Sequence, residues 1–157
     1  MIAVLAAFGL TYYGAAVVQT LSHQAFGHVK RILPIYSSHT HGHHSRYARN
    51  ALLQDSWIAS ERHVLWYFAI PFSMIGLLVF TLAPLALFVT QLGALACSIA
   101  IHILLHRHYH LRGTPLERFG WFRRKRALHF IHHRRVHNNY AIVENWTDKL
   151  LGTYRDA

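Results

Sequence analysis

Two long stretches without Asp, Glu, Lys or Arg constrain the fold of this chain more than any other feature. The first runs from Met1 to Val29 and the second from His63 to His106, a run of 44 residues. A run of this length has no polar face to show to water, which argues against an ordinary soluble domain. We therefore predict an all-α, integral membrane protein, and the length of 157 residues predicts a single domain covering 1–157.

The lengths of the two stretches predict three transmembrane helices. One crossing needs roughly 20 apolar residues, and the segment from Ile2 to Thr20 supplies the first. As one helix, the segment from Val64 to Leu105 would measure about 63 Å, which is twice the bilayer core. Pro84 near its midpoint predicts a break. We expect spans at about 2–20, 64–82 and 84–105. The alternative for the first, a cleaved signal peptide, lacks a basic n-region.

The charged residues predict the orientation in the membrane. All 16 Lys and Arg and all 6 Asp and Glu lie in 30–62 and 107–157. With three spans, the segments at about 21–63 and 106–157 face the same side. The excess of basic residues predicts that this side is cytoplasmic and that the N-terminus lies outside. The protein would then be a multi-pass membrane protein with a histidine-rich helical cap in the cytoplasm.

Fifteen histidines are present, and most belong to four clusters near the predicted cytoplasmic side. Spacings of three and four residues place imidazoles on one helix face, so each cluster predicts a chelating set. The first pair is spaced by five, which requires a helix end or a local π-type widening. The clusters are His23-x4-His28, His39-x3-His43-His44, His102-x3-His106 and His129-x2-His132-His133.

Clustered imidazoles of this number predict two metal ions. Without metal they would be positive charges or unsatisfied nitrogens at close range. Imidazole suits iron, zinc, copper and nickel, and a structural zinc needs only four ligands. His41 and His110 are alternative ligands, because they also fit the spacing of the second and third clusters. The predicted ligands are His23, His28, His39, His43, His44, His102, His106, His129, His132 and His133.

The order of these motifs resembles the fatty acid hydroxylase and sterol desaturase superfamily of histidine-rich, integral-membrane di-iron enzymes. The resemblance runs from about His23 to Tyr154 and includes the ending NNYAIVENWTDKLLGTY at 138–154. That ending is similar to the family's Asn-Tyr-Gly and Trp-Asp-x-x-x-Gly-Thr signature. This chain has Ala141 in place of the glycine, and Thr147 separates its Trp and Asp. The chain has three expected spans where four are commoner in the family, so either a second subunit of an oligomer completes the substrate tunnel or the tunnel is smaller.

The resemblance implies a membrane-bound, O2-dependent monooxygenase. It would hold two Fe ions, with Zn possible in purified protein, and would hydroxylate an unactivated C–H bond of a lipid-like substrate. Desaturation on the same scaffold is the alternative outcome. Candidates to orient the ligand rings are Asn139 and Asp148, together with Glu61, Glu144 and Asn138.

An external electron donor is implied, of the cytochrome or ferredoxin type. The chain has no glycine-rich dinucleotide turn and no cysteine cluster of its own. The basic tail would complement an acidic donor, or else attract anionic lipid headgroups.

Two other classes of protein agree less well with this sequence. A divalent-metal transporter needs polar ligands in mid-membrane, but the expected mid-span positions hold at most Gln91, Ser73 and Thr81. A basic module for nucleic acid would not explain the histidine spacing, so we predict no nucleic acid partner.

Overall fold

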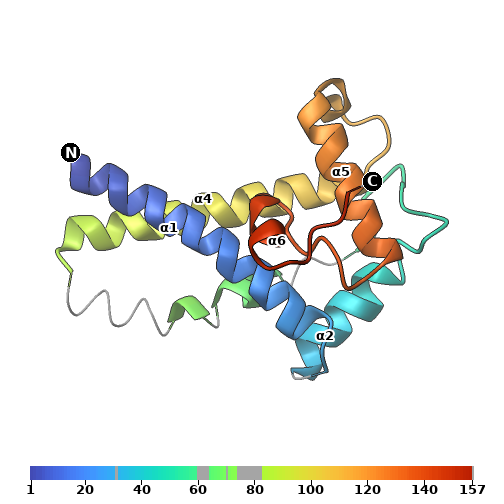
Figure 1. Ribbon diagram of the computed structural model, residues 1–157, viewed down its shortest axis with the longest axis horizontal. Helices are drawn as coiled ribbons and strands as arrows, with labels where there is room; N and C mark the ends of the chain where they lie inside the picture. The colour runs from blue at the N-terminus through green and yellow to red at the C-terminus, as the bar shows by residue number, and fades with distance from the viewer. Residues whose placement is uncertain (31, 60–63, 70, 74–82, 157) are drawn as a thin grey trace.

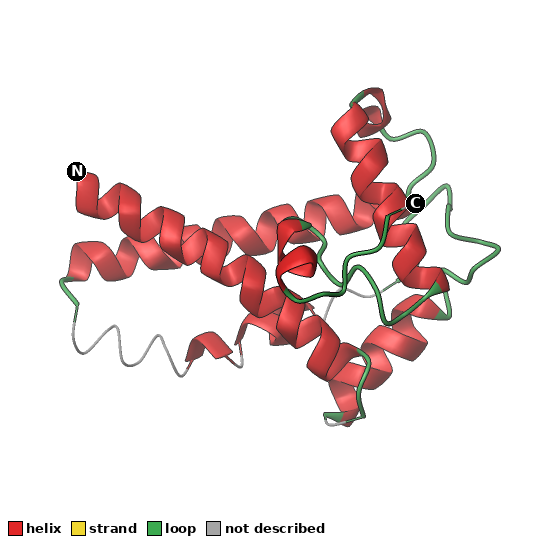
Figure 2. Cartoon of the chain, in the orientation of Figure 1, coloured by secondary structure: helices red, strands yellow, loops and turns green. Residues whose placement is uncertain are grey.

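The computed structural model describes residues 1–30, 32–59, 64–69, 71–73 and 83–156. These residues form helices joined by loops, and no β-strand occurs among them (Figure 2). An isolated β-bridge joins Gln54 to Leu111. The predicted all-α class is confirmed.

Two helices are long and apolar enough to cross a bilayer. Helix α1 (Ile2–Ser22) continues into a π-helical turn, η1 (His23–Gly27), and α4 spans Leu85–His110. Each run of 26 residues measures about 39 Å, against roughly 30 Å for the hydrocarbon core. The two helices pack together and begin at the same end of the molecule (Figure 1).

The sequence explains where α4 begins and where it ends. Pro84 is its N-cap residue, so the predicted start of a helix at this proline is confirmed. The helix ends at His110, five residues beyond the predicted end at Leu105, and its last turns bury His106, Tyr109 and His110. The second predicted span, at 64–82, falls only partly on described residues: 64–69 and 71–73 are helical, and 70 and 74–82 lie outside.

The starting ends of α1 and α4 expose apolar side chains. Ile2 is 82% exposed, and Leu85 is 70% exposed. Side chains of this kind suit contact with lipid better than contact with water.

Shorter helices gather at the other ends of α1 and α4 (Figure 1). Helix α5 (Gly120–Arg134) carries the fourth histidine cluster, and α6 (Trp146–Leu150) is tied to α1 by the Thr147 and Thr20 hydroxyls, 2.8 Å apart. Apolar clusters flank this region, one around Tyr67 and Phe68 and the other around Tyr109 and Phe122. The short elements are α2 (Leu33–His39), the π-helical turn η2 (Thr40–His44), the 3-10 helix η3 (Pro115–Arg118), α5 (Gly120–Arg134) and α6 (Trp146–Leu150).

Candidate metal centre

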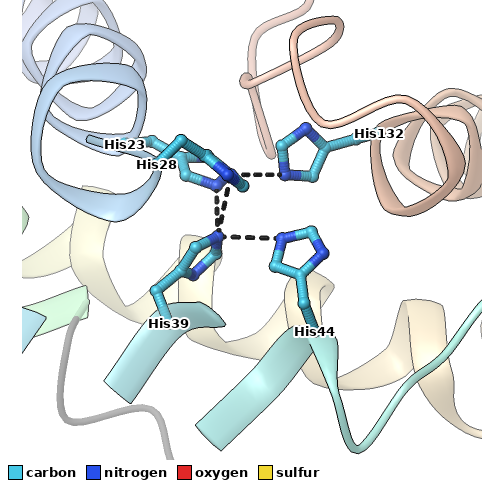
Figure 3. Close-up of side chains that lie close together, drawn as sticks. All are labelled: His23, His28, His39, His44 and His132. Atoms are coloured by element: carbon cyan, nitrogen blue, oxygen red, sulfur yellow. Dashed lines mark hydrogen bonds between the residues drawn. The ribbon is translucent and has the colours of Figure 1, made fainter. Parts of the chain in front are cut away.

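Nine imidazoles form two groups, and within each group the potential ligand nitrogens all lie within 4.8 Å of one another. His106 adjoins the second group, because its Nε2 lies 3.1 Å from Nε2 of His43. The first imidazole group is His23, His28, His39, His44 and His132 (Figure 3). The second imidazole group is His43, His110, His129 and His133.

Two π-helical turns position the histidines of the first two clusters in these groups. The turn at His23–Gly27 confirms the widening that the five-residue spacing of His23 and His28 predicted. The turn at Thr40–His44 brings His39 and His44 into the first group, although they too are five residues apart. His43 joins the second group. The expectation that His39 and His43 point to one place is therefore wrong, because the wider turn changes the angle between successive side chains.

Helix α5 likewise serves both groups from one continuous helix. His129 and His133, one turn apart, belong to the second group, and His132 belongs to the first. On α4, His106 and His110 are also one turn apart and both reach the second group.

The Nε2 atoms of neighbouring rings lie about as close as ligands around one ion. In the first group, Nε2 of His39 lies 2.9 Å from that of His23, 3.1 Å from that of His28 and 3.0 Å from that of His44 (Figure 3). In the second group, Nε2 of His129 lies 2.9 Å from that of His110 and 3.1 Å from that of His133.

Hydrogen bonding alone cannot satisfy these nitrogens. Nδ1 of His23 lies 2.6 Å from the Tyr140 carbonyl oxygen, and Nδ1 of His132 lies 2.8 Å from that of Asn138. A carbonyl oxygen only accepts, so each Nδ1 carries the hydrogen and each Nε2 presents a lone pair. His39 has at most one hydrogen to donate from an Nε2 that faces three others. A cation satisfies all these lone pairs at once.

The second group is fixed in the same way. His110 donates from Nδ1 to the Leu52 carbonyl oxygen at 2.9 Å, and His133 donates to that of Tyr47 at 2.9 Å. Their Nε2 lone pairs both face Nε2 of His129, which can donate to only one of them.

The separations also distinguish between coordination geometries. With a metal–nitrogen distance of about 2.1 Å, adjacent ligands at right angles lie about 3.0 Å apart, and tetrahedral ligands lie about 3.4 Å apart. The closest pairs of the first group, such as His39 and His44 at 3.0 Å, match the right-angle value. Five donors in one group also exceed the four of a structural zinc. The five donors of the first group fit a five- or six-coordinate ion.

Burial keeps these imidazoles in the neutral form that binds metal. It lowers the pKa of His132 to about 4, and it lowers the pKa of His43 and His129 well below the ordinary value. Neighbouring histidines act in the same direction, because a second positive charge nearby disfavours protonation. The ligands therefore need no deprotonation near pH 7.

Asp148 acts on the first group through the backbone. It is fully buried and accepts hydrogen bonds from the amides of Tyr140 at 2.8 Å and Ala141 at 3.0 Å, and from the Thr153 hydroxyl at 2.7 Å. The same loop supplies the carbonyls that fix His23 and His132. This carboxylate thus holds the loop that orients two of the rings.

The other candidates for orienting the rings are placed as follows. Asn139 supports the loop from the other side, with a φ of 53° and side-chain bonds to the carbonyls of Leu128 and Arg155. Asn138 contributes its carbonyl, as described above. Glu144 accepts from the Tyr12 hydroxyl at 3.3 Å, and Glu61 lies outside the described residues.

The structure also places the alternative ligands. His110, which the sequence analysis gave as an alternative ligand, lies in the second group. His102 is buried with its ring centroid 5.6 Å from that of His106, but it belongs to neither group. His41 is exposed beside Tyr36.

Gly27 packs directly against the first imidazole group, a contact that the sequence analysis did not predict. A Cβ atom here would lie 2.5 Å from the Tyr67 hydroxyl oxygen, 3.0 Å from Cδ2 of His39 and 3.1 Å from Cδ2 of His23. The close packing of the first group therefore requires glycine. Its position directly before His28 is the one signal in the sequence.

Comparison with known proteins gives no match: no family model, no curated protein and no solved structure is significantly similar to this chain. The resemblance to the hydroxylase and desaturase superfamily therefore stays a prediction that rests on the motifs.

Proposed function

We propose that this protein is a membrane-bound di-iron enzyme that uses O2 to hydroxylate an unactivated C–H bond of a lipid-like substrate. The observation that carries the proposal is the pair of imidazole groups, whose Nε2 atoms face one another at 2.9 to 3.1 Å. The groups adjoin, since the rings of His44 and His133 stack with centroids 4.2 Å apart. Two adjacent all-nitrogen sites suit a binuclear centre better than two independent structural ions.

The side chains would hold two irons, which would supply the O2 activation and the oxidising power for C–H cleavage. Around them, the carbonyls of Tyr140 and Asn138 hold two rings in the required tautomer. The buried position of His43 and His129 excludes water from the second group. Desaturation of the same substrate class would use the same residues.

The position of the histidines along α1 and α4 supports a site at one membrane surface. His23 comes 21 residues after Ile2, and His106 comes 21 residues after Leu85. At 1.5 Å per residue, both lie about 32 Å from the helix start, which is about one hydrocarbon thickness. We propose three spans, with the basic, histidine-bearing side in the cytoplasm and the N-terminus outside.

An apolar groove supports access for a lipid-like substrate. It has a volume of about 230 Å³ and lies on α1 beside the turn that begins at His23. An apolar chain could reach this wall of the site from the bilayer without crossing water. The groove is lined by Val18, Leu21, Ser22, Ala25, Phe26 and Pro71.

An acidic carrier protein is the proposed source of electrons. Arg134, Arg135 and Arg155 line an open cavity of about 470 Å³ on α5, together with Phe130 and with Asp156, whose carboxylate is paired with Arg124. Positive charge around an apolar base complements an acidic cytochrome or ferredoxin.

The test is to load detergent-purified protein anaerobically with Fe(II), then to measure iron per chain and to supply 18O2 with a chemical reductant and membrane lipids. We expect about two irons per chain and labelled oxygen in a lipid alcohol, or an unlabelled alkene if the reaction is desaturation. The double variant His132→Ala, His133→Ala should lose both results, and the exposed His41→Ala should keep them.

Zinc alone at a single site that is indifferent to His132 and His133 would refute the proposal. Metal flux through liposomes containing the protein, without lipid oxidation, would favour a transporter instead.

A further inference from the structure

Exposed aromatic rings and arginines meet where η3 joins α5. Phe119 is 37% exposed and Trp121 is 49% exposed. Their ring centroids lie 6.0 Å apart with planes 22° from parallel, and the guanidinium carbon of Arg118 lies 4.7 Å from the Phe119 centroid. These rings are held in place rather than buried, which marks an interaction surface.

The charges on this segment are unevenly neutralised. Glu117 forms an ion pair with Arg126 at 2.9 Å, so it is already engaged. Within the described part of the chain, neither Arg118 nor Arg123 forms an ion pair with a carboxylate, and both are exposed. Arg123 donates a hydrogen bond to the Glu117 carbonyl oxygen at 2.7 Å, so the segment offers two positive charges that no described carboxylate neutralises, beside two exposed aromatic rings.

The segment also lies close to the end of the apolar helix α4. Pro115, which begins η3, follows the end of α4 by only five residues. Figure 1 shows η3 and the start of α5 projecting to one side of α1 and α4, near the end that carries the histidines. If α4 crosses the bilayer, as the proposed function requires, a segment that leaves its end sideways lies along the headgroups.

We propose that Phe119 and Trp121 insert at the headgroup level of the membrane and that Arg118 and Arg123 bind the phosphates of anionic phospholipids. Aromatic rings concentrate at this level of a bilayer because they are apolar with a polar or polarisable edge. Each basic residue near an anionic surface strengthens association about fivefold. The inner side of α5 carries His129, His132 and His133, so this contact anchors the helix that serves both imidazole groups.

The experiment uses the full chain in lipid nanodiscs of phosphatidylcholine, with or without phosphatidylglycerol. An environment-sensitive fluorophore is attached at Gly120→Cys in a Cys97→Ser background, because Gly120 is exposed and its nearest neighbour to an added Cβ is 3.8 Å away. Lipids spin-labelled near the headgroup quench the fluorophore if it lies at the surface. A second label at Arg135→Cys, at the far end of α5, is the matched control.

We expect quenching at position 120 that increases with phosphatidylglycerol, and little quenching at position 135. The double variant Arg118→Glu, Arg123→Glu should abolish the increase, whereas Arg134→Glu, Arg135→Glu should keep it. A fluorophore at 120 that stays in water, or quenching that is indifferent to phosphatidylglycerol, would overturn the proposal.

A separate label on the native Cys97, within α4, reports whether that helix crosses the bilayer. Deep quenching there together with a water-exposed position 120 would refute the anchor alone, and shallow quenching at Cys97 would refute the membrane topology as well.

Discussion

The two imidazole groups contain the same ligand type but differ in how the protein holds them. All four rings of the second group are buried, whereas His28 and His44 of the first are partly exposed. Carbonyls near η2 orient the second group, from Tyr47 and Leu52, and the C-terminal loop orients the first. The first group therefore depends on segments more than 100 residues apart in the chain, His23 and Tyr140 among them.

This difference teaches that two metal ions with the same type of ligand need not exchange with the solvent at the same rate. An ion in the first group would have solvent-accessible ligands and a frame that a single loop holds. An ion in the second would exchange only when buried helices separate. Substitutions that disrupt one imidazole group and leave the other intact test this difference.

The largest effect is expected from two adjacent residues. His132→Ala should remove the first ion and His133→Ala the second, so that each variant keeps about one iron per chain. Metal analysis and the absorption spectrum of a Co(II)-loaded protein would separate the two cases. If both variants lose the same ion, the division into two groups is wrong.

A fall in pH should destabilise the metal-free protein by several kcal/mol. Burial lowers the pKa of His132 to about 4, so the folded state resists protonation that the unfolded state accepts below about 6.5. The stabilisation is complete above that pH and is lost as the pH falls, by about 1.4 kcal/mol per unit for each such residue.

His44, His129 and His133 act with the same sign, because their pKa values are also lowered. Thermal unfolding of the metal-free protein between pH 7 and 5 measures the effect. Bound metal should move the acid transition to lower pH, and a stability independent of pH would contradict the neutral, buried imidazoles.

Gly27→Ala should disturb the first group while sparing the second. The added methyl would collide with Tyr67 and the rings of His23 and His39, at a cost of about 1 to 3 kcal/mol. We expect a lower melting temperature and loss of one ion. Gly93→Ala is the control, because its Cβ would meet nothing within 4 Å. An equal effect of both changes would point to the helix backbone instead.

The smallest effect is expected from Asp148→Asn, which keeps the shape but gives the Tyr140 and Ala141 amides a poorer acceptor. Metal affinity at the first group should fall about 10- to 100-fold, with the second group unchanged. Isothermal titration with Zn(II) measures both. The exposed Asp156→Asn, whose carboxylate pairs with Arg124, should leave both affinities unchanged.

Much of this arrangement could be predicted from the sequence. The charge-free stretches predicted the apolar helices, and Pro84 predicted the start of α4. The spacing of His23 and His28 predicted either a helix end or a π-type turn, and the structure has the turn. These features follow from local periodicity, which depends only on neighbouring residues.

The division of each cluster between two groups could not be predicted in the same way. It depends on the rotation of one helix relative to another. The spacing of residues within one helix gives no information about that rotation. The backbone carbonyls that accept hydrogen bonds from the imidazoles could not be predicted either. Every residue has a carbonyl, and only the folded chain shows that those of Tyr140 and Leu52 lie next to an imidazole. The presence of His110 in the second group, and the absence of His102 from both groups, likewise depends on how the helices pack.

Each of the two π-helical turns accommodates one extra residue between histidines that share an imidazole group. Deleting Ala25 would reduce the spacing of His23 and His28 from five residues to four, and a regular helix already places residues four apart on one face. We therefore expect the turn to become regular helix while the two rings stay together. Inserting a residue there would instead set the rings six positions apart, on different faces of a helix, and the first imidazole group would lose His28 although all fifteen histidines remain in the chain.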